Sequence, residues 1–132
     1  MSEISGRSIL VVEDHLDTQM LMRQILKKEG HTVEVVGTGA EALKKLETFS
    51  PDVILLDLSL PGMSGEEFMK SLRGDARTAG IKVLIISGWD NLKERAEAIG
   101  ADGCIRKPFQ IAQFQKQLEA TFSNSLPTSP TF

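Results

Sequence analysis

The sequence feature that most constrains the fold is a short apolar run that ends abruptly in an acid. The run from Val53 to Leu56 contains only Val, Ile and Leu, and Asp57 follows it directly. The run is too short for an ordinary helix and Pro51 stands just before it, so it is typical of a strand buried on both faces of a parallel sheet. Asp57 would then stand at the carboxyl end of that strand, where open α/β sheets bind their ligands. Because an unpaired buried carboxylate costs free energy, we expect the rest of the chain to supply its partners.

Apolar runs of strand length alternate with segments of helical periodicity along the rest of the chain. Further strands are predicted at residues 8–12, 32–36, 82–86 and 103–105, and each strand is followed by apolar residues at helical spacing. Thr38 with Glu41, and Ser64 with Glu67, have the spacing of a capping box at a helix start. Five strands alternating with five helices predict an α/β fold, in which helices cover both faces of a doubly wound, five-stranded parallel sheet.

The size and charge of the chain limit the classes of protein to which it can belong. Its 132 residues suit one domain, and a net charge of -3 argues against direct nucleic-acid binding. The single cysteine, Cys104, excludes an internal disulfide and a multi-cysteine metal site. No run approaches the roughly 20 apolar residues of a membrane span, so we expect a cytoplasmic protein without membrane contact. We predict a flexible N-terminus at 1–6, one domain at 7–122, and a disordered tail or linker stub at 123–132, which is uncharged and rich in Ser, Thr and Pro.

Polar or reactive side chains follow four of the five predicted strands. Glu13 and Asp14 follow the first, Asp57 the third, Ser87 the fourth and Lys107 the fifth. The carboxyl ends of parallel strands meet at one edge of a sheet, so these side chains should converge. Carboxylates are ligands for a hard divalent cation such as Mg²⁺, while a lysine and a hydroxyl can bind a phosphoryl group. The pattern predicts a site for a cation together with a phosphoryl group.

This ordered set of residues, with Gly88 after the serine and Pro108-Phe109 after the lysine, resembles the receiver domain of two-component response regulators. The resemblance covers roughly Ser8 to Phe122. It implies a flavodoxin-like fold with the strand order 2-1-3-4-5, one of the common orders of doubly wound parallel sheets. It also implies that Asp57 accepts a phosphoryl group from the phosphohistidine of a histidine kinase or of a histidine phosphotransfer protein.

The same resemblance implies roles for the surrounding residues. Asp14, Asp57 and the backbone carbonyl of Ser59 would ligate Mg²⁺, and Glu13 would act mostly through a coordinated water. Lys107 would contact the phosphoryl group, Ser87 would turn inward to it, and the Lys107-Pro108 bond would be cis. Such a chain would be a signalling switch that catalyses only its own phosphotransfer and dephosphorylation, rather than a turnover enzyme. Its downstream partner would bind the face of the fourth helix, fifth strand and fifth helix.

One position departs from the family pattern and one question of context stays open. Cys104 stands three residues before the lysine, where the family often has Tyr or Phe, so coupling from Ser87 to the last two helices cannot use that aromatic ring. No output domain follows in this sequence, which suits either a single-domain regulator or the receiver part of a hybrid kinase.

Three alternatives fit the sequence less well. A pseudo-receiver that only binds partners would need a broken site. A haloacid dehalogenase-type aspartyl phosphatase would need an acid at Ser59. The segment 37–42 fits a dinucleotide fingerprint, but that interpretation leaves Ser87 and Lys107 without a role. His15 and His31 have no ligand spacing, and we assign neither of them a metal role.

Overall fold

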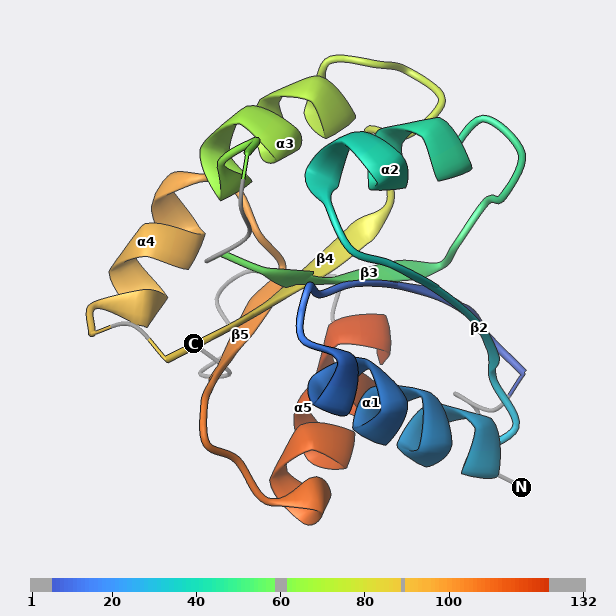
Figure 1. Ribbon diagram of the computed structural model, residues 1–132. Coiled ribbons are helices and arrows are strands. Elements are labelled where there is room, and N and C mark those ends of the chain that lie inside the picture. The colour runs from blue at the N-terminus through green and yellow to red at the C-terminus, as the bar shows by residue number, and fades with distance from the viewer. Residues whose placement is uncertain (1–5, 59–61, 89, 124–132) are drawn as a thin grey trace.

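The computed structural model describes residues 6–58, 62–88 and 90–123. Nearly all of the predicted flexible N-terminus and tail lies outside these residues, as does Ser59. Five strands and five helices alternate along the described chain (Figure 1): β1 (Ser8–Val12), α1 (Leu16–Lys28), β2 (Thr32–Val36), α2 (Gly39–Lys45), β3 (Val53–Asp57), α3 (Gly65–Arg73), β4 (Lys82–Ser87), α4 (Leu92–Ala98), β5 (Gly103–Arg106) and α5 (Ile111–Ser123).

The strands form one parallel sheet in the order β2-β1-β3-β4-β5. Helices α1 and α5 cover one face of the sheet, and α2, α3 and α4 cover the other (Figure 1). The predicted doubly wound α/β fold and its strand order are therefore confirmed. Two strands run one residue further than predicted, so that Ser87 and Arg106 are strand residues.

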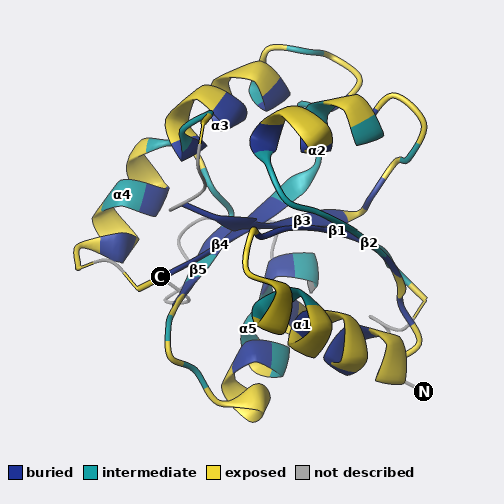
Figure 2. Cartoon of the chain, viewed as in Figure 1, coloured by how far each residue is buried: buried dark blue, intermediate teal, exposed yellow. Residues whose placement is uncertain are grey.

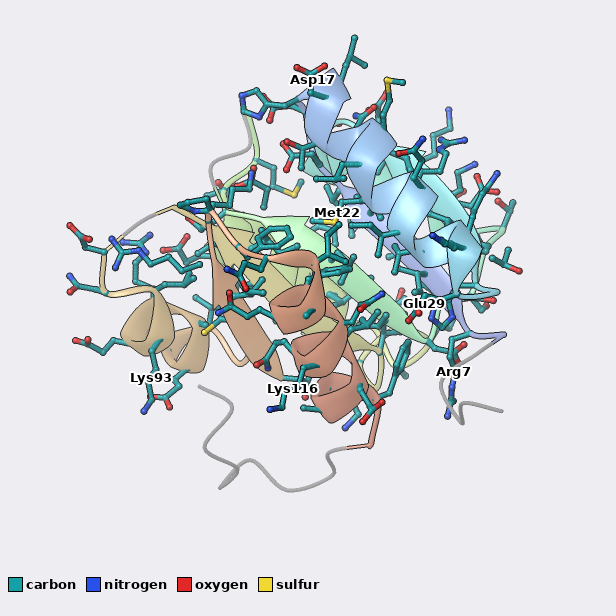
Figure 3. The ribbon with its side chains drawn as sticks, turned by 90° about the horizontal axis from the view of Figure 1, so that it is seen from below. Arg7, Asp17, Met22, Glu29, Lys93 and Lys116 are labelled. Carbon is teal, nitrogen blue, oxygen red and sulfur yellow. The ribbon has the colours of Figure 1, made fainter. Side chains whose placement is uncertain are left out.

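The core has two layers, one on each side of β3. Val53 and Leu55 pack with residues of α1 and α5, while Ile54 and Leu56 pack with residues of α2, α3 and α4. Every residue of β3 is buried, as the dark centre of Figure 2 shows. Successive side chains of a strand point to opposite faces, so a strand covered on both faces needs an unbroken apolar run. On the α1 side, Met22 is fully buried against the sheet (Figure 3).

Local capping interactions fix where α3 and α2 begin. The predicted capping box of Ser64 and Glu67 is complete, with both reciprocal hydrogen bonds present at the start of α3. At the start of α2, the Thr38 hydroxyl accepts from the backbone N–H of Glu41, but the Glu41 carboxylate accepts from the backbone N–H of Gly37 instead of completing the box.

The described helices include none with the length and apolar character needed to cross a membrane.

Candidate functional site

Four strands bring polar side chains to the carboxyl edge of the sheet. Asp57 ends β3 and Ser87 ends β4. Glu13 follows β1, where its backbone N–H donates to the Val36 carbonyl at 3.0 Å. Lys107 follows β5, and its backbone N–H donates to the Ser87 carbonyl at 2.8 Å. Glu13, Asp57 and Ser87 are 3%, 2% and 0% exposed, so two of the acids lie almost out of water.

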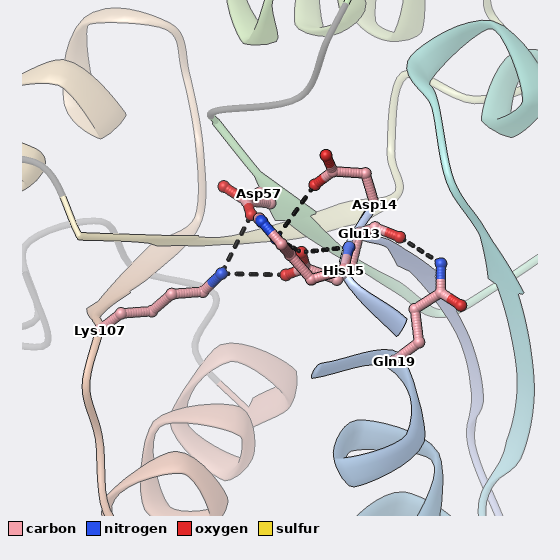
Figure 4. Close-up of polar contacts among 6 residues, drawn as sticks. All are labelled: Glu13, Asp14, His15, Gln19, Asp57 and Lys107. Carbon is pink, nitrogen blue, oxygen red and sulfur yellow. Dashed lines mark hydrogen bonds and ion pairs between the residues drawn. The ribbon is translucent and has the colours of Figure 1, made fainter. Parts of the chain in front are cut away.

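The Lys107 ammonium lies between the two buried carboxylates. Its Nζ donates to Glu13 Oε1 and to Asp57 Oδ2, each at 3.0 Å (Figure 4). Burial alone would lower the pKa of Lys107, but the hydrogen bonds to Glu13 and Asp57 outweigh burial and hold the pKa above the ordinary lysine value. The lysine therefore stays charged and offsets the negative charge of both acids. The Lys107-Pro108 peptide bond that follows is cis, as expected.

His15 joins this cluster, which the sequence analysis missed. Its Nδ1 lies 2.9 Å from Glu13 Oε2 and 3.2 Å from Asp14 Oδ1 (Figure 4). Its backbone N–H also donates to Glu13 Oε2, at 3.1 Å. The hydrogen bond to Glu13 and the nearby charge of Asp14 raise the pKa of His15. The Gln19 side-chain amide donates to the Glu13 carbonyl and ties the first turn of α1 to the same loop.

The donor set suits a divalent cation. One ligand atom from each of Glu13, Asp14, His15 and Asp57 can be chosen so that all four lie within 4.8 Å of one another. Three of these residues offer carboxylate oxygens, the donor type that Mg²⁺ prefers. Asp14 is the most exposed of the three acids, so the cluster has one side toward water. The fourth predicted oxygen, the Ser59 carbonyl, lies outside the described residues.

Cys104 lies in β5, half-buried beside the layer of the core formed with α2, α3 and α4. Burial raises the pKa of its thiol, which keeps the thiol protonated and favours a packing role.

Comparison with known proteins identifies the family. The model of the response regulator receiver domain matches residues 9–119. The chain is 33% identical over 119 residues to the two-component response regulator PhoP of Pseudomonas aeruginosa, covering 89% of this chain and 52% of that protein. It is 35% identical over 115 residues to the sensory transduction protein RegX3 of Mycolicibacterium smegmatis, covering 86% of this chain and 49% of that protein. The chain thus spans about half the length of these curated relatives.

Solved structures agree in fold. The chemotaxis response regulator CheY4 of Vibrio cholerae superposes with a TM-score of 0.83 at 28% identity, covering 89% of this chain and 99% of that chain. The receiver domain of the sensor histidine kinase PA1611 of Pseudomonas aeruginosa, a structure with magnesium coordinated in its active-site cleft, superposes with a TM-score of 0.82 at 24% identity, covering 91% of this chain and 100% of that chain. With its matching family model, parallel sheet and acidic edge, the chain belongs to the receiver domain family of two-component response regulators.

Proposed function

We propose that Asp57 is the phospho-acceptor of this receiver domain and that the phosphoryl donor is the phosphohistidine of a histidine kinase or of a histidine phosphotransfer protein. The observation that carries the proposal is the Asp57 carboxylate at the end of β3, held at 3.0 Å by the Lys107 ammonium and close to two further acids. An Asp57 oxygen bonds to phosphorus, the phosphorus–nitrogen bond of the donor breaks, and the leaving imidazole takes up a proton.

Mg²⁺ is the cation that we assign to this reaction. Asp14 and Asp57 would hold it, with the carbonyl of Ser59 as a third oxygen and Glu13 acting through water. The clustered oxygens support this choice, as does the magnesium reported in the cleft of the PA1611 receiver domain. When bound, the cation offsets the repulsion between the acids and an incoming phosphoryl group.

The protein's own groups then stabilise the phosphorylated state. Lys107 moves from its two carboxylates to the new phosphoryl oxygens, which carry more negative charge. Ser87 ends β4, the strand that pairs with β3, so we expect its hydroxyl to donate to the same group. Because Ser87 and Lys107 lead directly into α4 and α5, we expect the face of α4, β5 and α5 to change its affinity for a downstream protein.

Relatives contain this domain in more than one context. CheY4 matches it over 99% of its own chain, PhoP and RegX3 are about twice as long as this chain, and the histidine kinase P4 of Formosa agariphila contains a region 29% identical to it that spans 10% of that protein. In each context, this domain receives the phosphoryl group and passes the signal to a protein partner, with no direct nucleic-acid contact of its own.

Intact mass spectrometry with acetyl phosphate and Mg²⁺ tests the proposal. The wild-type chain should gain one phosphoryl group, and the gain should disappear in Asp57→Asn or when EDTA replaces Mg²⁺. Asp52→Asn is the matched control, because Asp52 precedes the same strand at its opposite end and binds the backbone N–H of Ser8. Labelling that survives in Asp57→Asn would contradict the assignment, and a wild-type chain that gains no mass would indicate a pseudo-receiver.

A further inference from the structure

The place of His15 at the start of α1 is unusual for an N-cap residue. Its backbone is extended there, yet its side chain makes no capping hydrogen bond to the helix. The imidazole Nδ1 instead lies beside Glu13 and Asp14, while the side chain as a whole is 66% exposed. The ring therefore has a nitrogen at the acidic cluster and access to water at the same time.

We propose that His15 is a nitrogen ligand, through Nδ1, for a borderline divalent cation of the class of Co²⁺, Ni²⁺ and Zn²⁺ at this site. The proposal deepens the proposed function, since it concerns the metal preference of the same site. It assigns this receiver domain a mixed nitrogen and oxygen donor set in place of one made of oxygens alone.

The distances suit ligands of one ion. Two ligands bound at about 2.1 Å lie about 3.0 Å apart in neighbouring octahedral positions and about 3.4 Å apart in a tetrahedron. Nδ1 of His15 lies 2.9 Å from Glu13 Oε2 and 3.2 Å from Asp14 Oδ1. A cation could therefore be bound by these three atoms with little movement of the ring.

The chemistry of imidazole sets the preference. An imidazole nitrogen is a favourable ligand for first-row transition metals, so His15 would add to the affinity of the site for Co²⁺, Ni²⁺ and Zn²⁺. Mg²⁺ takes oxygen ligands and keeps several waters, so it gains little from His15. With Nδ1 on the cation, Nε2 carries the proton and can donate to water at the exposed side of the ring.

The sequence allows a clear spectroscopic test. It contains two histidines and one cysteine. His31 directly precedes β2 and therefore lies at the amino ends of the strands, whereas the site lies at their carboxyl ends. Cys104 lies within β5. A Cys104→Ser background removes the thiol, and His31→Asn serves as the matched control for the loss of an imidazole.

Co²⁺ and Mg²⁺ titrations at pH 8 should be followed by calorimetry, with the visible absorption of Co²⁺ as a second readout. We expect His15→Ala to weaken Co²⁺ binding roughly tenfold or more and to change the Co²⁺ spectrum, while Mg²⁺ binding changes less than about twofold. His31→Asn should leave both titrations unchanged. On titration with Zn²⁺, which gives sharp spectra, the ¹⁵N resonance of His15 Nδ1 in the wild type should shift.

Two results would overturn the assignment. Equal weakening of Co²⁺ and Mg²⁺ would show that His15 only orients the carboxylates, and unchanged Co²⁺ binding would show that the ring is no ligand. These titrations contain no phosphoryl donor. Failure of the wild type to become labelled in Mg²⁺ would therefore count against the phospho-acceptor role alone, and leave the metal result to be judged separately.

Discussion

Replacing Lys107 by Met tests how much the central ion cluster contributes to stability. The substitution keeps a long apolar side chain but removes the ammonium that Glu13 and Asp57 share at 3.0 Å. Removing one partner of a fully buried ion pair costs about 3–5 kcal/mol. The Lys107 side chain is 26% exposed, and water screens it from the open side, so we expect a loss of about 2 kcal/mol in the free energy of unfolding.

The pH and the cation decide how much of this loss is seen. The pKa of Lys107 is raised in the folded state, so its contribution is fully present below the ordinary lysine pKa of 10.5 and is lost as the pH rises through the folded value. At pH 8 the whole effect is measurable. The Mg²⁺ proposed for this site would neutralise the same carboxylates in the folded state, so it should restore more than half of the lost free energy.

Urea unfolding followed by circular dichroism, in EDTA and in saturating Mg²⁺, measures both effects. Lys116→Met is the control, because Lys116 is an exposed lysine of α5 (Figure 3) and should change stability by less than about 0.5 kcal/mol. If Lys107→Met were as stable as the wild type in EDTA, or equally destabilised with and without Mg²⁺, the proposed charge balance would be wrong.

Three further predictions concern stability away from the site. Arg73 donates to the carbonyls of Ala79, Ile81 and Gly100 and to Asp102, so in urea unfolding Arg73→Ala should lose about 2 kcal/mol and Arg73→Lys less; equal losses in the two variants would argue against the multiple hydrogen bonds. Ser64→Ala removes the cap of α3 and should cost about 1 kcal/mol in the same assay, and a change within error would mean that the cap adds nothing. Burial lowers the pKa of His31; the charge of Arg7 adds to this effect, while Glu29, the backbone hydrogen bond of Arg7 and Asp52 oppose it. The unfolded chain therefore takes up the proton first, and wild-type stability should fall as the pH drops below about 6.5. In unfolding curves against pH, His31→Asn should lack this part of the fall, and an identical pH profile would refute it.

The parts of the fold that sequence predicts best are those set by local pattern. The unbroken apolar run of β3 results from burial on both faces, and the parallel topology then places Glu13 beside Lys107, although 94 positions separate them in the chain. The Ser64 capping box could be predicted because its two partners are only three residues apart in the sequence.

The contacts that sequence missed depend on how side chains turn in the folded structure. Nothing in the spacing of His15 marks it as a partner of Glu13, because the direction of its ring is set by the turn from β1 into α1. Arg73 likewise binds carbonyls of the α3–β4 and α4–β5 connections, and backbone acceptors leave no residue pattern. Thr38 and Glu41 had the spacing of a full capping box, yet Glu41 binds the backbone of Gly37, one residue earlier than the box requires.

The most direct test of the central claim is to locate the phosphoryl group on the chain. The wild-type protein would be phosphorylated with acetyl phosphate and Mg²⁺ and then treated with borohydride, which reduces an acyl phosphate of aspartate to homoserine. Peptide sequencing by mass spectrometry would then identify the reduced residue. We predict that Asp57, and not Asp14 or Glu13, is converted; reduction at another acid, or a phosphoryl group on a serine or histidine, would contradict the account.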